Sequence, residues 1–162
     1  MLDRWDLRET PAFNPVQLDY GWVQWWKFPL LEKAKRSFLA GAPSERRDAY
    51  HAVCAREGAW LDDFALFMAV KEDYQKKADA QGLMGKMWSN FWDFDIRMKQ
   101  PEATAAWTTR LGDQIDVKKV LQFWFFEQWT ALKTYANGHG ISIIGDIPIF
   151  VAADSVDVWA NR

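Results

Sequence analysis

Cysteine and histidine, which form disulfides and ligate transition metals, are scarce in this 162-residue sequence. The single cysteine, Cys54, excludes an internal disulfide and any metal cluster built on cysteines. The two histidines, His51 and His139, lie too far apart in the sequence to form a metal-binding motif. The composition therefore predicts a chain without a metal site, and it suits a reducing compartment.

Long apolar runs and an excess of one charge are also missing. Glu127 and Asp146 interrupt the two most apolar stretches, so neither is long enough to span a bilayer. The net charge of −2 gives no electrostatic case for nucleic acid or for an anionic membrane surface as a partner. The first six residues, 1–6, show no core of a signal peptide.

Aromatic residues, by contrast, are abundant: the chain has 11 Trp, 11 Phe and 4 Tyr. Large aromatic side chains usually fill a dense core between helices. They also stack on the flat CH faces of sugar rings, so an aromatic surplus is typical of sugar sites as well. Composition favours the core, and both interpretations stay open at this point.

Helical patterns account for most of the chain, because apolar residues recur every three or four positions between recognisable caps and stops. The predicted helices cover 20–39, 45–56, 60–72, 101–111 and 117–136. Asp19 caps the first, Pro29 kinks or restarts it, and Gly58 separates the second from the third. A short strand over 65–70 competes with the third helix, and 73–90 read as an irregular surface segment.

Two of these helices have features of their own. Pro101 occupies the first turn of its helix, where proline is well tolerated. The helix over 117–136 is apolar around most of its circumference, which predicts burial on more than one side, and Asn137 and Gly138 end it.

The neighbouring acids Asp62 and Asp63 point in different directions on a helix, so they are a cap and a surface charge rather than a catalytic pair.

The most informative stretch follows the last long helix. Residues 141–144 are β-branched apart from Ser142 and lie between glycines, which predicts a buried parallel strand. Asp146 comes just past the end of this strand, where ligands bind in α/β folds. A carboxylate that only hydrogen-bonds the following turn is the alternative. Residues 154–157 have the form of a capping box that opens one more helix.

The segment GDIPIFVAADSVDVW, residues 145–159, resembles the 4-α-glucanotransferases of glycoside hydrolase family 77, also called amylomaltases or disproportionating enzymes. Other stretches agree with this resemblance in the same order along the chain. They are DYGWV at 19–23 with Lys27, PLL at 29–31, WLDDFALFMAVK at 60–71, LQF at 121–123, QW at 128–129 and YAN at 135–137. The resemblance covers nearly the whole chain.

The resemblance implies an α/β fold, a (β/α)8 TIM barrel with an inserted helical subdomain, of which this chain is a partial, helix-rich piece. Residues 1–112 correspond to the helical insertion region, and 113–162 to a barrel helix, a strand and the start of the next helix. It implies transfer of part of an α-1,4-glucan to the 4-hydroxyl of an acceptor glucose or glucan, with retention of configuration. The implied partners are malto-oligosaccharides, glucose and α-1,4-glucans, and the resemblance implies no cofactor or metal. The implied location is the cytoplasm or, for a plant parent, the plastid.

Four residues match family positions at the sugar site. Asp146 matches the aspartate that holds the glucose ring next to the bond being cut, while Asp154, Ser155 and Trp159 match the loop that follows. We expect these three to act first as wall and cap residues and second as sugar contacts. No catalytic residue is assigned, because the family's nucleophile and acid/base lie beyond the C-terminus of this chain. The chain is therefore expected to be an inactive fragment on its own.

Two other functions compete. A nucleotide-dependent α/β protein would need a glycine-rich phosphate loop after a strand, but Gly138 and Gly140 precede the expected strand. A non-catalytic piece that binds malto-oligosaccharides through its aromatics and Asp146 is the remaining alternative. Binding without turnover would distinguish it from the transferase.

Overall fold

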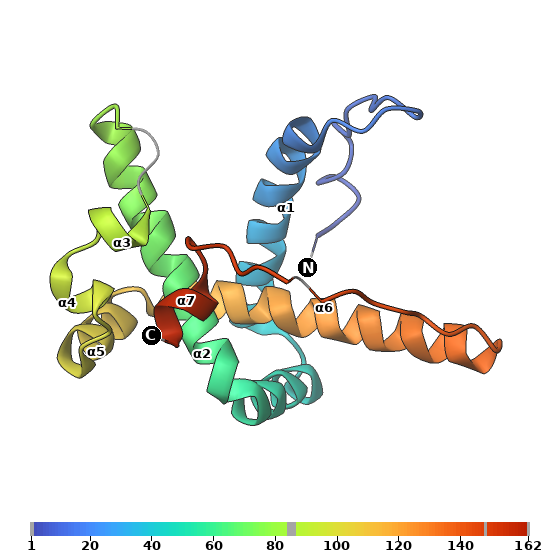
Figure 1. The fold of residues 1–162 in the computed structure, drawn as a ribbon. Helices are drawn as coiled ribbons and strands as arrows, with labels where there is room; N and C mark the ends of the chain where they lie inside the picture. Colours follow the sequence, from blue (N-terminus) through green and yellow to red (C-terminus); the bar gives the residue numbers. More distant parts are fainter. Residues whose placement is uncertain (1, 84–86, 148, 162) are drawn as a thin grey trace. The chain divides into compact units, whose positions relative to one another are not determined.

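The computed structural model describes residues 2–83, 87–147 and 149–161. Seven helices occur in these residues, and Figure 1 shows their order along the chain. They are α1 (Tyr20–Gly41), α2 (Ser44–Ala80), α3 (Trp88–Phe91), α4 (Phe94–Arg97), α5 (Pro101–Arg110), α6 (Gly112–Gly138) and α7 (Val156–Ala160). The chain divides into two compact units, Met1–His51 and Ala52–Arg162, and α2 contributes residues to both.

The first unit is built on α1. Asp19 caps it as predicted, because its carboxylate accepts the backbone N–H of Trp22 at 3.0 Å. The helix continues through Pro29, so the predicted restart at this residue is wrong. Phe38 is buried in this unit against Tyr50, and their rings meet edge to face with centroids 5.9 Å apart.

The helix α2 differs from the sequence prediction in two ways. It is one helix of 37 residues, so Gly58 does not separate two helices, and the competing strand over 65–70 is also wrong. The part of the expected surface segment up to Ala80 is helical too, while 84–86 lie outside the described residues. The C-terminal turns of α2 are polar in composition, but Tyr74 and Ala78 within them are buried. These packing contacts stabilise the helix, and local composition does not reveal them.

The end of α2 carries a glycine where the backbone requires one. Gly82 has φ of +65°, in the left-handed region that side chains disfavour. The Leu83 N–H donates to the carbonyl of Ala78 at 2.9 Å and the Gly82 N–H to that of Asp79 at 3.1 Å. This pair of bonds satisfies the last carbonyls of the helix, as in a Schellman motif.

Gly58→Ala is expected to stabilise the chain by about 0.5–1 kcal/mol, since glycine loses more backbone entropy than alanine inside a helix. An added Cβ would lie 3.5 Å from Oδ2 of Asp62, an ordinary van der Waals contact. Urea unfolding followed by circular dichroism measures the change. Gly82→Ala is the matched control with the opposite sign, because its positive φ should cost about 1–2 kcal/mol. A lower unfolding midpoint for Gly58→Ala would contradict a continuous α2.

The core of the second unit is an aromatic cluster between α2 and the short helices. The ring of Tyr74 stacks on Trp92 at 5.6 Å and on Trp107 at 5.4 Å between centroids. Its hydroxyl accepts the backbone N–H of Asp93 at 3.0 Å, and burial raises the pKa of Tyr74 to about 12. Part of the aromatic surplus of this unit therefore serves a core, as composition favoured, while other rings, among them Phe94 and Phe125, are exposed.

The helices α5 and α6 agree with prediction in part. Pro101 begins α5 as expected, but α6 already begins at Gly112, ahead of the predicted start at residue 117. The end near Gly138 is confirmed. Burial of α6 on more than one side is wrong for its C-terminal half in this chain, where five apolar side chains are between 39% and 66% exposed. They are Phe125, Phe126, Trp129, Leu132 and Tyr135.

The predicted strand over 141–144 is not formed. Residues 141–147 are extended without secondary structure, and Figure 1 shows the chain turning back toward α7 after the end of α6. A strand needs a neighbouring strand to form hydrogen bonds with its backbone N–H and C=O groups, and the described residues contain no other strand. The α/β barrel is thus not seen in this helix-rich chain, and the division at residue 112 stays a prediction.

Candidate functional site

The segment that carries Asp146 starts from a well-defined helix end. Gly140 adopts φ of +74° after α6, and the Ile141 N–H donates to the carbonyl of Ala136 at 3.0 Å. Beyond Ile141 the chain is extended, and Ile144 is 93% exposed. The point where the segment leaves α6 is therefore fixed, while its apolar side chains have few contacts within the chain.

Asp146 lies exposed near the middle of this segment. Its Oδ1 accepts the backbone N–H of the next residue, Ile147, at 2.8 Å. This is the turn contact that the sequence analysis named as the alternative. The contact engages one oxygen and leaves the carboxylate at the surface, so it is compatible with hydrogen bonds from a ligand to the second oxygen.

The far end of the segment is held by Asp154. Its Oδ2 accepts a hydrogen bond from Nζ of Lys71 on α2 at 2.5 Å, and the same Nζ lies 3.3 Å from the Asp154 carbonyl oxygen. The neighbouring carbonyl of Ala153 accepts the indole N–H of Trp88 at 2.9 Å. Lys71 and Trp88 thus donate to two successive backbone carbonyls, those of Asp154 and Ala153, and these bonds hold both residues in place.

The second oxygen of Asp154 is turned inward. Oδ1 is buried and has no hydrogen-bond partner among the described residues. A sugar hydroxyl cannot reach a buried oxygen in this conformation. The carboxylate of Asp154 is thus engaged with Lys71 through Oδ2, and its role at a sugar site stays a prediction.

Ser155 and Trp159 occupy structural positions as well. The Ser155 hydroxyl accepts the backbone N–H of Val158 at 3.4 Å and caps α7, as the capping pattern predicted. Trp159 is fully buried and donates its indole N–H to the carbonyl of Ile96 at 3.0 Å. A ring without exposed surface offers no face to a sugar. Of the four residues, Asp146 is exposed, Asp154 and Ser155 are partly buried, and Trp159 is buried.

The adjacent acids on α2 have separate partners. Asp62 pairs with Lys119 at 2.6 Å, and Asp63 pairs with Lys99. Their carboxylates point toward different elements, in agreement with the sequence argument that they do not form a catalytic pair. Lys99 itself has φ of +53°, an uncommon conformation for a side-chain-bearing residue, at the end of α4.

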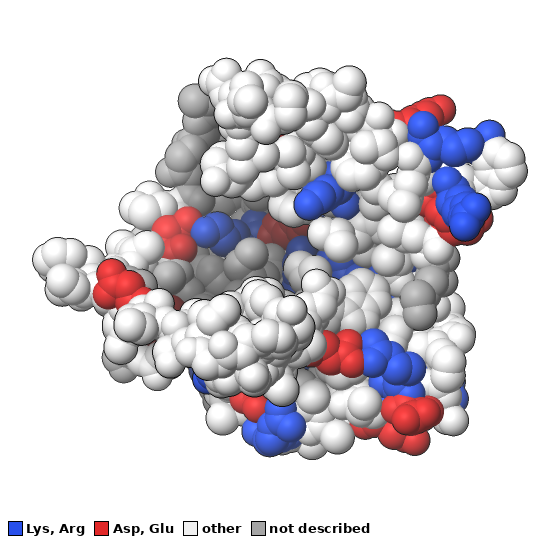
Figure 2. Space-filling model, turned by 90° about the vertical axis from the view of Figure 1, so that its right-hand side faces the viewer, with Lys and Arg blue, Asp and Glu red and all other residues white. Residues whose placement is uncertain are grey.

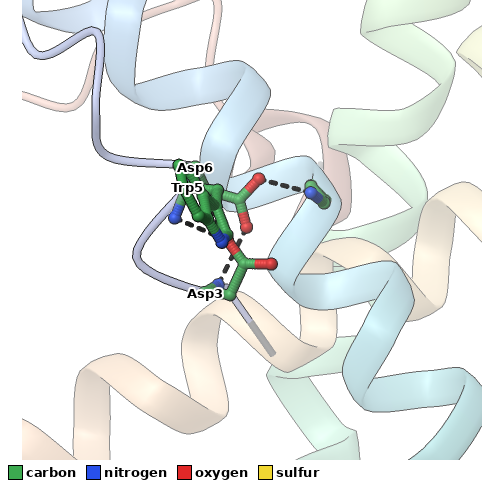
Figure 3. A network of polar contacts seen from close by, with 4 residues as sticks. Asp3, Trp5 and Asp6 are labelled. Carbon is green, nitrogen blue, oxygen red and sulfur yellow. Dashed lines mark hydrogen bonds and ion pairs between the residues drawn. The ribbon is translucent and has the colours of Figure 1, made fainter.

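A second set of carboxylates lies in the first unit. Asp3 and Asp6 bond each other's backbone: Asp3 N–H donates to Asp6 Oδ2 at 2.9 Å and Asp6 N–H to Asp3 Oδ1 at 3.1 Å. Trp5 N–H donates to Asp3 Oδ1 at 2.7 Å, and Lys33 pairs with Asp6. Figure 3 shows this network. The hydrogen bond from Lys33 lowers the pKa of Asp6, so its carboxylate is committed to this turn.

Other kinds of site are not formed by the described residues. No group of three or more His, Cys, Asp and Glu side chains could hold a metal ion among residues 2–83, 87–147 and 149–161. In the same part of the chain no helix is both long and apolar enough to cross a bilayer. On the face drawn in Figure 2, acidic and basic side chains are interspersed, and neither sign forms a continuous patch.

Lys71 and Trp88 are the residues that sequence reasoning missed. They lie 83 and 65 positions from their partners in the loop, so no local pattern points to them. A lysine at a helical core position, in the run from Trp60 to Lys71, was the one available signal, since a charge on an apolar face needs a partner.

The comparisons with known proteins agree with the motif analysis. The family described as 4-alpha-glucanotransferase matches residues 2–162. The chain is 40% identical over 153 residues to the 4-alpha-glucanotransferase of Thermus thermophilus, covering 94% of this chain and 29% of that protein. It is 37% identical to that of Synechocystis sp., covering 96% and 29%, and 32% identical to a chloroplastic/amyloplastic 4-alpha-glucanotransferase of Oryza sativa, covering 96% and 25%.

A solved structure gives the same result. The amylomaltase of Streptococcus agalactiae, in complex with acarbose, superposes with a TM-score of 0.78 at 36% identity, covering 93% of this chain and 28% of that one. The chain thus spans less than a third of the length of these relatives. A match over residues 2–162, together with this structural likeness, shows that the chain belongs to the 4-alpha-glucanotransferase family.

Proposed function

We propose that this chain supplies the Asp146-bearing part of the sugar site of a 4-α-glucanotransferase. The family match over residues 2–162 is the observation that carries the proposal, and the exposed carboxylate of Asp146 supports it. The enzyme moves a segment of an α-1,4-glucan to the 4-hydroxyl of glucose or another glucan. Acarbose, bound by the Streptococcus agalactiae amylomaltase, indicates the type of ligand.

The proposed role of Asp146 is to hold a sugar ring. An ionised carboxylate accepts hydrogen bonds from sugar hydroxyls, and bonds that tighten as the ring distorts stabilise the transition state more than the bound substrate. A retaining reaction also needs a nucleophilic carboxylate and a carboxylic acid about 5–5.5 Å apart. We assign neither to a residue of this chain, so we propose that the chain alone does not turn over glucans.

The location is proposed on the same basis. Relatives from Oryza sativa and Solanum tuberosum are named chloroplastic/amyloplastic. We propose the plastid for a plant parent and the cytoplasm otherwise.

Segment exchange tests this function. The part of the Streptococcus agalactiae amylomaltase that superposes on this chain is replaced by the chain, and glucose and longer oligomers formed from maltotriose are resolved by chromatography. We expect disproportionation by this chimera and none by the 162-residue chain alone. A chimera with native-like circular dichroism but without products would contradict the transferase. Products formed by the chain alone would contradict the proposal that the nucleophile and the acid/base residue are not among residues 1–162.

Calorimetric titration of the chain with maltotriose and acarbose tests the alternative function. Binding by the chain, combined with an inactive but folded chimera, would favour the non-catalytic malto-oligosaccharide-binding piece.

A further inference from the structure

The segment between α6 and α7 connects two fixed points. Its start is set by the turn at Gly140, and its end by the contacts of Ala153 and Asp154. Between them the apolar side chains are largely exposed: Ile144, Ile147, Ile149 and Phe150 are 83% to 93% accessible. A segment with so few contacts of its own is placed by its ends, and Asp146 lies within it.

Lys71 makes the charged part of the end contact. Its Nζ lies 2.5 Å from Oδ2 and 3.3 Å from the carbonyl oxygen of Asp154, so one ammonium fixes both the side chain and the backbone of this residue. The two side chains are 37% and 31% exposed, which places the pair at the edge of the core rather than in open solvent. Charge-assisted bonds of this kind are stronger than neutral ones.

The backbone of Lys71 belongs to a well-packed part of α2. It follows a buried stretch of α2 in which Phe67, Ala69 and Val70 are at most 2% exposed, and its Nζ lies 5.6 Å from the centroid of the Phe67 ring. A lysine on a well-packed helix can hold a loop in one place, because its own backbone does not move with the loop. Trp88, also buried, supplies the neighbouring bond to Ala153.

We propose that Lys71 is a positioning residue for the sugar site: by holding Asp154 it sets the course of the segment that carries Asp146. The inference rests on the proposed function, since a sugar site must exist for the segment to shape it. It predicts a defect in substrate binding that exceeds any loss of folding. Removal of the ammonium loosens the end of the segment at Asp154 without touching Asp146, while Trp88 still holds Ala153.

Lys71→Met, made in the chimera, is the main test, because methionine keeps most of the side-chain stem and removes the charge. We expect kcat/KM for maltotriose to fall about tenfold, with a higher KM and a lower kcat, because a displaced Asp146 weakens the contact with the bound sugar and still more the contact with the transition state. A merely destabilised enzyme has fewer active molecules, so its kcat falls and its KM stays constant. Lys71→Arg should restore most of the lost affinity.

Lys119→Met is the matched control. Lys119 also forms an ion pair with an aspartate, Asp62, at 2.6 Å within the same unit, and this partner lies on α2 rather than in the segment that carries Asp146. We expect its KM to stay within about twofold of the parent. Equal KM values for Lys71→Met and Lys119→Met would overturn the inference and leave the transferase standing.

Hydrogen exchange on the 162-residue chain tests the same point without activity. In Lys71→Met the indole N–H of Trp88 and the amide of Trp159 should exchange about fivefold faster or more, with the amide of Val120 in α6 unchanged. Unchanged exchange at Trp88 and Trp159 would overturn the inference even if the chimera failed to fold. An inactive parent chimera would contradict the proposed function instead, and the two failures are thus distinguishable.

Discussion

Trp159→Ala lowers the free energy of unfolding by about 3–5 kcal/mol, the range expected for removal of a buried aromatic side chain. The Trp159 ring has no exposed surface, and its centroid lies 5.7 Å from that of Phe67 and 6.1 Å from that of Trp92. Its loss leaves a cavity in this cluster. It also leaves the carbonyl of Ile96 without the indole donor. Urea unfolding at equilibrium measures the effect.

The structural reason for so large an effect is the shortness of α7. Five residues cannot form a stable helix alone, so the buried ring of Trp159 holds α7 to the rest of its unit. Phe150→Ala is the control, because that ring is 89% exposed and its removal should change stability by no more than about 0.5 kcal/mol. Trp159→Phe separates the two contributions, since it keeps a ring and loses the hydrogen bond. Similar values for Trp159→Ala and Phe150→Ala would contradict the packing described here.

Asp146→Ala is expected to lower kcat/KM of the chimera about 100-fold. A hydrogen bond to a charged group contributes about 1.5–3 kcal/mol, and one that tightens in the transition state contributes to the rate. Asp146→Asn keeps one acceptor oxygen and should lose less. Maltotriose disproportionation at substrate concentrations below KM measures both.

Asp116→Ala controls for the loss of one negative charge. Asp116 is an exposed carboxylate on α6 of the same unit, outside the segment that carries Asp146. Its removal should leave kcat/KM unchanged. If Asp146→Ala retained the full rate, Asp146 would have no role at the sugar site, and its contact with the Ile147 N–H would be its whole function.

Local chemistry made several features predictable. The Asp19 cap, the proline in the first turn of α5 and the serine cap of α7 each depend on a few neighbouring residues, and each was found where the sequence placed it. Gly58 shows the limit of this reasoning. A glycine inside a helix costs about 0.5–1 kcal/mol, which the packing of Leu61, Ala65 and their neighbours outweighs.

Contacts between distant residues could not be predicted. The bond between Lys71 and Asp154 joins positions 83 apart, and no periodicity encodes it. The strand expected over 141–144 failed for a related reason: its pattern fits a buried strand, but the described residues provide no neighbouring strand to pair with it. The proposed sugar site therefore rests on the sequence motif around Asp146 rather than on a contact between distant residues of this chain.

The exposure of the segment after α6 has a consequence for handling this protein in solution. Residues 141–153 are rich in isoleucine and contain a single charged side chain, Asp146. Short, uncharged, β-branched segments are the usual nuclei of intermolecular β-pairing, and one charge within them acts as a gatekeeper. The carboxylate proposed to hold a sugar is therefore expected to oppose self-association of this segment as well, together with the proline at position 148. Substitutions at this position change colloidal behaviour together with affinity, so their assays require dilute protein and a light-scattering check.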